Sequence, residues 1–339
     1  MRALLLCLCV LLHAVPAFAS ASAGLSEAAA AMERKDYAAA HATLTPLAES
    51  GNAEAQYVLG RLYAAGQGCR KDEGKAAALF RQAARQGEPS AQNSLGAFLL
   101  EGRGVGKNAA EAAEWFRKAA DQGLAAAEYN LALLYAEGRG VAKNPQTAFT
   151  WQQRAANQGY APSQYVLGWM HLHGKGVQRS ETKALHWFQQ AAGQGEPRAQ
   201  NELGSFYAQG LAVPQDYAKA ADLYRKAADQ GYAPAQYNLG VLHEEGFGRS
   251  RNMEEARRWY RKAADGGDKD ARGALDLLDK GKTGAARAGK DGKDGKDGKD
   301  TKKSAKKSAK KQADPGKVQQ KKKARKKQGG DGVQTPSAP

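Results

Sequence analysis

The chain has 339 residues, a formal charge of +16 and 42% hydrophobic residues. By length alone it forms either two ordinary domains or one elongated array. It has three cysteines, two of which, Cys7 and Cys9, lie close to the N-terminus. If that segment is removed, Cys69 is the last cysteine left, so an intramolecular disulfide is excluded and packing must supply the stability.

Residues 1–19 have the layout of a secretory signal peptide. Arg2 precedes an apolar run over residues 3–15, and Pro16 is followed by the small-x-small end Ala17-Phe18-Ala19. The run is too short to span a bilayer as a mature helix. We therefore expect cleavage after Ala19 and export to the periplasm or the medium, with no transmembrane span afterwards. The alternative is an uncleaved membrane anchor.

A period of 36 residues follows. The pair Leu-Gly recurs at this step, for example at Leu59-Gly60 and Leu95-Gly96, and Leu131-Ala132 replaces it once. Such a period predicts a repeat architecture. Residues 20–52 are expected to form N-terminal capping helices, and residues 269–280 a C-terminal capping helix. The six full units are residues 53–88, 89–124, 125–160, 161–196, 197–232 and 233–268.

Each unit is predicted to form two α-helices. In the last unit Ala235, Leu239 and Leu242 recur at helical spacing, and Gly246 then supplies a left-handed C-terminal cap. The glycine inside the first helix, such as Gly240, costs about 1 kcal/mol relative to alanine, so we expect a close backbone approach there. The second helix of every unit begins at a residue that can cap it: Asp72, Asn108, Asn144, Ser180, Asp216 and Asn252.

The pattern A-x-x-x-L-G-x-x-Y-x-x-G-x-G-V, a polar cap, and then A-x-x-W-F-x-x-A-A-x-x-G resembles the Sel1-like repeat, a relative of the tetratricopeptide repeat. The resemblance covers roughly residues 36 to 280. It implies an all-α fold, a right-handed superhelical solenoid of stacked helix-turn-helix repeats of 36 residues. The chain departs from the pattern at Ala132, at Leu211-Ala212 and at Arg249. Members with paired cysteines have been linked to β-lactam binding, but this chain lacks the pairs.

No residue is a convincing candidate for catalysis, and no metal or cofactor is expected. Cys69 aligns with valines in four of the units, which favours a small buried apolar position over a reactive thiol. His171 aligns with tyrosines and is expected to pack, while His173 and His186 occupy outward positions. The glycines recur at helix ends and do not form a phosphate-binding loop. We therefore expect that the chain is not an enzyme.

Partner binding is expected on one face of the first helices, where the residues vary between units. We number positions from the first residue of each repeat; the fifth and ninth positions share a face by helical spacing. By resemblance to tetratricopeptide arrays, this face lines a concave groove that holds a peptide or protein segment, with Trp169 as its anchor. The alternative is that the tyrosines pack between neighbouring helices. The candidate residues are Tyr57, Arg61, Asn93, Tyr129, Leu133, Tyr165, Trp169, Asn201, Tyr237 and Val241.

Residues 281–339 are expected to form a disordered, lysine-rich tail. Residues 280–339 carry 20 Lys and Arg against 6 Asp, a net +14, whereas residues 1–279 carry 31 against 29. Such a tail attracts anionic membrane surfaces and polymers, and without aromatic side chains it is not expected to bind nucleic acid specifically. The alternative is a solubilising extension. The candidate polyanion-binding residues are Lys302, Lys303, Lys306, Lys307, Lys310, Lys311, Lys321, Lys322, Lys323, Arg325, Lys326 and Lys327.

The leading hypothesis is a non-enzymatic scaffold or adaptor of the bacterial cell envelope. Its groove holds an unidentified protein partner, and its tail keeps it near an anionic surface. The alternative makes the tail primary, as a binder of membrane surfaces, lipopolysaccharide, cell-wall polymers or nucleic acid. A third hypothesis, a hydrolase of cell-wall or β-lactam substrates, lacks a candidate catalytic group.

Overall fold

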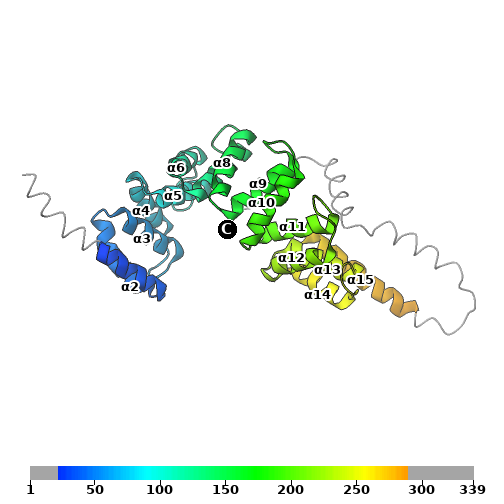
Figure 1. Cartoon of the computed structure of the whole chain (residues 1–339). Helices are drawn as coiled ribbons and strands as arrows, with labels where there is room; N and C mark the ends of the chain where they lie inside the picture. The colour runs from blue at the N-terminus through cyan, green and yellow to red at the C-terminus, as the bar shows by residue number, and fades with distance from the viewer. Residues whose placement is uncertain (1–21, 289–339) are drawn as a thin grey trace, which may run out of the picture. The chain divides into compact units, whose positions relative to one another are not determined.

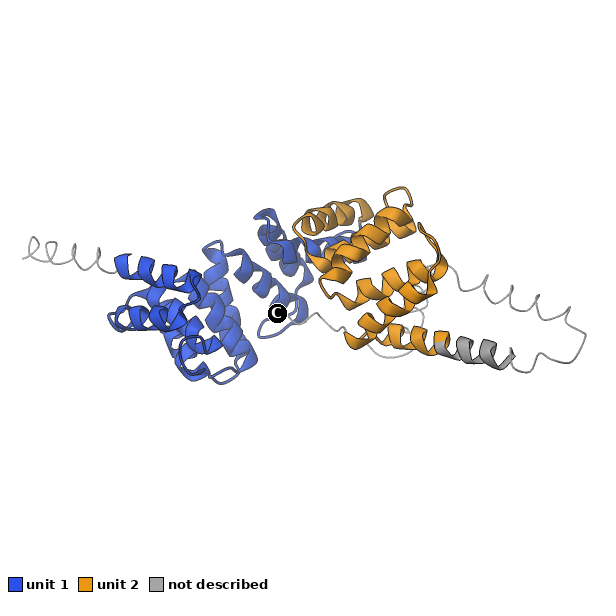
Figure 2. Cartoon of the chain, turned by 90° about the horizontal axis from the view of Figure 1, so that it is seen from below, with its two compact units in different colours: residues 1–179 blue, residues 180–339 orange. Residues whose placement is uncertain are grey.

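The structure, a computed structural model, describes residues 22–288, and helices are the regular elements in that range, with no strand (Figure 1). The chain divides into two compact units, and the boundary between them falls after Arg179 (Figure 2). The first unit holds a helix over residues 22–33 and then α2 (Tyr37–Glu49), α3 (Ala53–Ala65), α4 (Glu73–Arg85), α5 (Pro89–Glu101), α6 (Ala109–Asp121), α7 (Ala125–Glu137), α8 (Pro145–Asn157) and α9 (Ala161–His173). The second holds α10 (Glu181–Gly193), α11 (Pro197–Gln209), α12 (Tyr217–Asp229), α13 (Ala233–Glu245), α14 (Met253–Asp265) and α15 (Lys269–Ala288).

Within each unit, every helix packs against the next one along the chain. The helices therefore form stacked hairpins, one for each of the five repeats that lie within a unit, as the sequence predicts, while the fourth repeat contributes α9 to the first unit and α10 to the second. The predicted all-α repeat fold is confirmed. Because a hairpin of two short helices buries little apolar surface by itself, the neighbouring repeats supply the rest of its core.

The helix ends are set by the capping residues expected from the sequence. In the second repeat, Asn108 Oδ1 accepts a hydrogen bond from the backbone N–H of Glu111 at 3.1 Å. The side chain at this position caps the second helix of all six repeats. The first helices all end at a glycine in the left-handed conformation, such as Gly102 with a φ of 80°. These predicted caps are confirmed.

The glycine inside the first helix makes room for an aromatic ring. A Cβ added to Gly96 would lie 2.8 Å from Cε1 of Phe116, the ring of the second helix in the same repeat. Phe80, Tyr224 and Tyr260 lie equally close to the glycines of their own repeats. The expected close approach is therefore present: the ring is the nearest neighbour, and at Gly60 and Gly204 a backbone carbonyl of the facing helix also lies 3.3 Å from the added Cβ.

The third repeat replaces both members of this pair. Ala132 takes the place of the glycine, and Gln152 takes the place of the ring at the register of Phe116. Both side chains are buried, with Gln152 1% exposed. A flexible amide chain leaves space for the methyl group of Ala132 that a ring would fill. This exchange explains why the repeat accepts alanine at a position that is glycine in the other five.

A line of buried amides joins successive repeats. Gln92, at the fourth position of the second repeat, donates from Nε2 to the carbonyl of Ala84 in the preceding repeat at 3.2 Å. Its Oε1 accepts a hydrogen bond from Gln122 Nε2 at 2.9 Å. A glutamine at the fourth position makes the same bond to the carbonyl eight residues before it in the first, fourth, fifth and sixth repeats, through Gln56, Gln164, Gln200 and Gln236.

The third repeat again differs. Glu128 stands at the fourth position, fully buried, and pairs with Arg154 Nε at 2.8 Å through Oε1. The guanidinium of Arg154 also donates to the carbonyl of Ala120 at 3.2 Å, the bond that a glutamine would make from position 128. Gln158 Nε2 donates to the other carboxylate oxygen at 2.8 Å. The arginine therefore restores the donor that the change from glutamine to glutamate removes.

Candidate functional site

The tyrosines predicted to face a partner pack mainly within their own repeats. Tyr129 is 5% exposed and its ring lies 5.6 Å from that of Tyr160, edge to face. Tyr57 and Tyr237 are partly exposed and contact Phe80 and Tyr260, with ring centroids 6.0 and 5.6 Å apart respectively. Tyr165, in α9, is also partly exposed.

The two predicted asparagines join adjacent first helices. Asn93 Oδ1 accepts a hydrogen bond from Asn130 Nδ2 at 2.9 Å, which links α5 to α7. Asn201 Oδ1 accepts an equivalent bond from Asn238 Nδ2 at 2.9 Å in the second unit. Asn201 is 4% exposed. These amides hold the spacing of the array, and the burial of Asn201 leaves it little area for a partner.

The ninth position carries one exposed and several partly exposed side chains. Arg61 is exposed and its guanidinium lies 5.8 Å from the ring centroid of Tyr57. Leu133 and Trp169 are partly exposed in α7 and α9, and Val241 is partly exposed in the second unit. The ring of Trp169 lies 4.5 Å from that of His173, one helical turn further along α9. Of the residues predicted from sequence, Arg61 is exposed, and Leu133 and Trp169 remain partly exposed.

The three histidines considered for metal binding lie in different surroundings. His171 is 3% exposed and packs edge to face on Phe149 at 5.6 Å, as expected for a packing residue. His173 and His186 are exposed, also as expected. No cluster of three metal-ligating side chains occurs within residues 22–288. The predicted signal peptide and the twelve tail cations from Lys302 to Lys327 lie outside the described residues.

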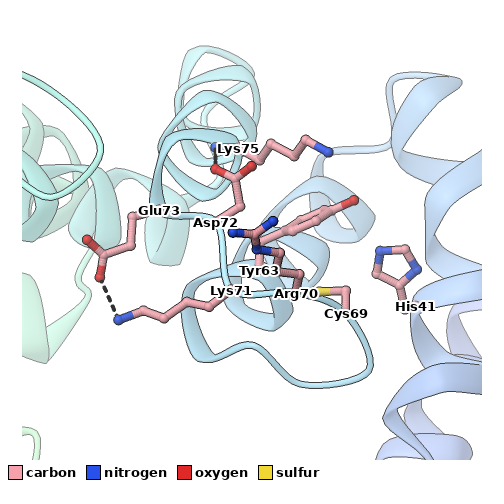
Figure 3. A pocket seen from close by; sticks show the side chains of 8 residues that line it. All are labelled: His41, Tyr63, Cys69, Arg70, Lys71, Asp72, Glu73 and Lys75. Carbon is pink, nitrogen blue, oxygen red and sulfur yellow. Dashed lines mark hydrogen bonds and ion pairs between the residues drawn. The ribbon is translucent and has the colours of Figure 1, made fainter.

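A pocket that the sequence did not predict lies at the first repeat (Figure 3). Its volume is about 820 Å³, and it opens between α2 and the loop that joins α3 to α4. His41 lies on α2, and the amine of Lys75 and the hydroxyl of Tyr63 extend toward the side on which His41 lies. The lining residues are His41, Tyr63, Cys69, Arg70, Lys71, Asp72, Glu73 and Lys75.

Both carboxylates of this pocket already have partners. Asp72 Oδ1 caps α4 by accepting from the backbone N–H of Lys75 at 2.9 Å. Glu73 Oε1 lies 3.1 Å from Lys71 Nζ and 3.0 Å from a terminal nitrogen of Arg103. The hydrogen bonds from these two cations hold the pKa of the Glu73 carboxyl below its usual value. The pocket therefore presents cations whose charge is not fully compensated.

Cys69 differs from its predicted environment, because its side chain is partly exposed and lines this pocket instead of filling a fully buried position. Burial raises the pKa of its thiol, with a smaller contribution from Asp72 and an opposing one from Lys75. A raised pKa leaves the thiol protonated at neutral pH, which makes it a poor nucleophile. The pocket is suited to binding an anion and not to covalent chemistry.

The second unit contains a carboxyl group with a raised pKa, that of Glu202. Glu202, at the sixth position of α11, accepts a weak hydrogen bond from Asn201 Nδ2 at 3.4 Å. Burial raises the pKa of its carboxyl to about 7, and this hydrogen bond only partly opposes the rise. Ser205 Oγ lies 3.1 Å from the hydroxyl of Tyr224 nearby. The sixth position is uncharged in the other five repeats.

The profile of the Sel1 repeat matches residues 53–88, 89–124, 125–160, 161–196, 197–232 and 233–268. The chain belongs to the Sel1 repeat family. This chain is similar to a Sel1 repeat protein from Oxalobacter formigenes whose crystal structure is known, with 32% sequence identity and a TM-score of 0.66. The match covers 72% of this chain and 96% of that one. A protective antigen present in uropathogenic Escherichia coli strains, with an SLR fold, is 36% identical over 77% of this chain, with a TM-score of 0.65. The match spans 56% of the antigen's length.

No match to a curated protein sequence was found. Sel1 repeat proteins are generally scaffolds that bind other proteins and do not catalyse reactions. In the part of the chain from residue 22 to residue 288, no helix combines the length and apolar character needed to cross a membrane.

The pocket could not be recognised from sequence motifs, because it results from a smaller side chain at a packing position. Four of the six Sel1 repeats have tryptophan at the twenty-seventh position, but the first repeat has Leu79 there, and the fifth has Leu223. A search for residue types that bind ligands does not detect a smaller residue at a packing position. Comparing each repeat with the others at this position would have drawn attention to the first repeat.

Proposed function

We propose that this chain is an exported, non-enzymatic Sel1 repeat scaffold that holds a protein partner against the first helices of its repeats. The proposal rests on one observation: the ninth position lies on the first helix of every repeat, but its side chain differs in each repeat of the first unit. Arg61 is exposed there, and Leu133 and Trp169 are partly exposed. A cation, an aliphatic chain and an indole in one register provide the varied contacts that a specific partner needs.

Export and the basic tail complete the proposal. The layout of residues 1–19 supports export. The relative from Escherichia coli, described as a protective antigen, offers an analogy, since an antigen must be accessible to the immune system. The net +14 of residues 280–339, from 20 cations and 6 Asp, would hold the scaffold near an anionic envelope surface.

The same charge supports the alternative function, in which the tail is the primary binder of a polyanion and the repeats are a carrier. Salt separates the two proposals. Binding of a +14 tail to a polyanion weakens steeply as ionic strength rises, whereas contacts through Leu133 and Trp169 depend little on salt.

The test is capture from an envelope extract by immobilised residues 20–339 and 20–280, at low and high salt. We expect one protein to remain bound to both forms at high salt, and Trp169→Ala to reduce its capture at least about tenfold, the loss of a central aromatic anchor. Trp115→Ala, which removes an indole from a second helix, is the matched control and should retain capture. Capture that needs residues 281–339 and disappears at high salt would contradict the scaffold and support the alternative.

A further inference from the structure

A groove runs between α2 and α4 in the first repeat, and it uses other residues than the proposed partner face. Beside the pocket of about 820 Å³ lies a second of about 410 Å³, and the two share Tyr63 and Lys75. We call the pair the first-repeat groove. The second pocket is lined by Thr45, Ala48 and Glu49 of α2, by Gln56, Leu59 and Tyr63 of α3, and by Lys75, Ala78, Leu79 and Gln82 of α4.

Small side chains on α4 leave the first-repeat groove open. Leu79 stands at the twenty-seventh position, which is tryptophan in the second, third, fourth and sixth repeats (Trp115, Trp151, Trp187 and Trp259). Ala78 precedes it, at a position that is larger in every other repeat. An indole at residue 79 would occupy space that the second pocket leaves free.

One end of the first-repeat groove is cationic. Arg70 and Lys75 both line it, and neither has an ion-pair partner among residues 22–288. Lys75 Nζ lies 5.3 Å from the ring centroid of Tyr63. The His41 ring meets the same tyrosine edge to face at 5.3 Å, and its Nε2 is buried without a hydrogen-bond partner. An anion placed here would meet two cations beside the ring of His41.

The other end has a different character. Leu59, Leu79 and Ala78 give it an apolar wall, the exposed Gln82 offers an amide, and Glu49 places a negative charge at its margin. A uniform polyanion would be repelled by Glu49 and would gain nothing from the apolar wall. A peptide with one acidic end fits both halves, because its carboxylate can meet the cations while an apolar side chain and the backbone lie along Leu79 and Gln82.

We propose that the first-repeat groove binds a peptide segment with an acidic end. The carboxylate lies between Arg70, Lys75 and His41, and the following residues extend past Tyr63 toward Leu79 and Gln82. This inference does not depend on the proposed function, since a partner could engage either surface alone.

The fifth repeat provides an internal control. Tyr207, Lys219 and Leu223 repeat the trio Tyr63, Lys75 and Leu79, and Lys219 Nζ lies 5.4 Å from the Tyr207 ring centroid. The cationic end is not reproduced, however. Leu185 stands in the register of His41, Pro214 in that of Arg70, and Asp216 lies 3.6 Å from Lys219 Nζ.

The test compares two pools of random heptapeptides with amidated C-termini, one with glutamate and one with glutamine as the last residue, on immobilised residues 20–339 at physiological salt. We expect the glutamate pool to be retained at least about tenfold better than the glutamine pool, the effect of one partly desolvated charge pair. Leu79→Trp, which fills the groove with the residue of four other repeats, should abolish this preference. Lys75→Gln should reduce it strongly.

The matched variants Leu223→Trp and Lys219→Gln should keep the preference, because the tail and the rest of the surface are the same in all four proteins. Helical circular dichroism of Leu79→Trp checks that the fold is retained. Equal preference in the parent and in Leu79→Trp, or no preference in the parent, would overturn the proposal. Retention of polyphosphate that Leu79→Trp removes, without peptide retention, would instead identify a polyanion site and would also contradict it.

Discussion

The second and third repeats have the same helices but different interiors. In the second, Gln92 bonds to the preceding repeat and Gly96 lies against the ring of Phe116. In the third, Glu128 with Arg154 replaces the glutamine, and Ala132 with Gln152 replaces the glycine and the ring.

Each of these changes is acceptable only because a second residue changes with it. A glutamate at position 128 needs the cation and the donor that Arg154 supplies. An alanine at position 132 needs a neighbour that leaves room for its methyl group. The frame of the repeat therefore constrains pairs of residues, and the variation of one position cannot be interpreted without its partner. Four substitution experiments test this dependence.

The largest effect is expected from Arg154→Gln. Glutamine stands in the same register in the first and fourth repeats, but here it would leave the buried carboxylate of Glu128 without its cation. Although the Arg154 side chain is 46% exposed, the carboxylate left unpaired is fully buried, so the change should lower the free energy of unfolding by about 3 kcal/mol, measured in urea at pH 7. Adding Glu128→Gln should recover most of this loss.

The matched change in the second repeat is Lys118→Gln. Lys118 is exposed and lies 4.0 Å from the ring centroid of Trp115, so the change should cost less than about 1 kcal/mol. Equal instability of Arg154→Gln with and without Glu128→Gln would show that the glutamate does not depend on the arginine.

Glu202 extends the comparison, because its partly buried carboxyl accepts a hydrogen bond from an amide, that of Asn201, where Glu128 pairs with an arginine. Its pKa rises from an ordinary 4.5 to about 7. Because folding raises the pKa of this carboxyl, the stability that the folded protein gains from keeping it protonated is fully present below about pH 4.5. That stability is lost as the pH rises through 7. Glu202→Gln should therefore stabilise the protein at pH 8 by on the order of 2 kcal/mol and change little at pH 4. Melting midpoints of both proteins from pH 4 to 8 test this; parallel curves would argue against it.

Gly96→Ala tests the ring contact. Alanine has the better helix propensity by about 1 kcal/mol, but its Cβ would lie 2.8 Å from Phe116 Cε1. We expect a net loss of about 1.5 kcal/mol, since overpacking outweighs propensity, measured by urea unfolding. A more stable variant would mean that the ring can move aside at little cost.

The smallest effect is expected from converting the third repeat to the interior of the second. Gln152→Phe alone should destabilise, because the ring would meet the methyl group of Ala132. Combined with Ala132→Gly, it should stabilise by about 1 kcal/mol, since it buries apolar surface and removes a buried amide oxygen that has no hydrogen-bond partner. Additive effects of the two changes in urea unfolding would show that the residues are not coupled.

The helix ends could be predicted from sequence because their causes are local. Asn108 caps a helix whose first turn it begins, and Gly102 ends one through its own backbone conformation. The repeat period then places all other ends at the same step. The fold of residues 53–268 therefore follows from patterns that lie within a few residues of each other.

The contacts of the candidate site could not be predicted in the same way. Arg61 and Tyr129 both stand at variable positions of one helix face, yet one is exposed and the other is 5% exposed. The difference depends on the ring of Tyr160 from the end of the same repeat, and so on how the helices cross. Helical spacing assigns residues to a face, but it does not show which neighbours cover that face.

The exchanges of the third repeat are contained within residues 125–160. Glu128 and Arg154 belong to the same 36-residue block, as do Ala132 and Gln152, and the one bond that leaves this set reaches a backbone carbonyl, that of Ala120. A backbone carbonyl is offered at this register by any preceding repeat. Both exchanged pairs would therefore stay intact if the block were moved to another position in the array, and Asn130 is the side chain that would need a new acceptor there in place of Asn93.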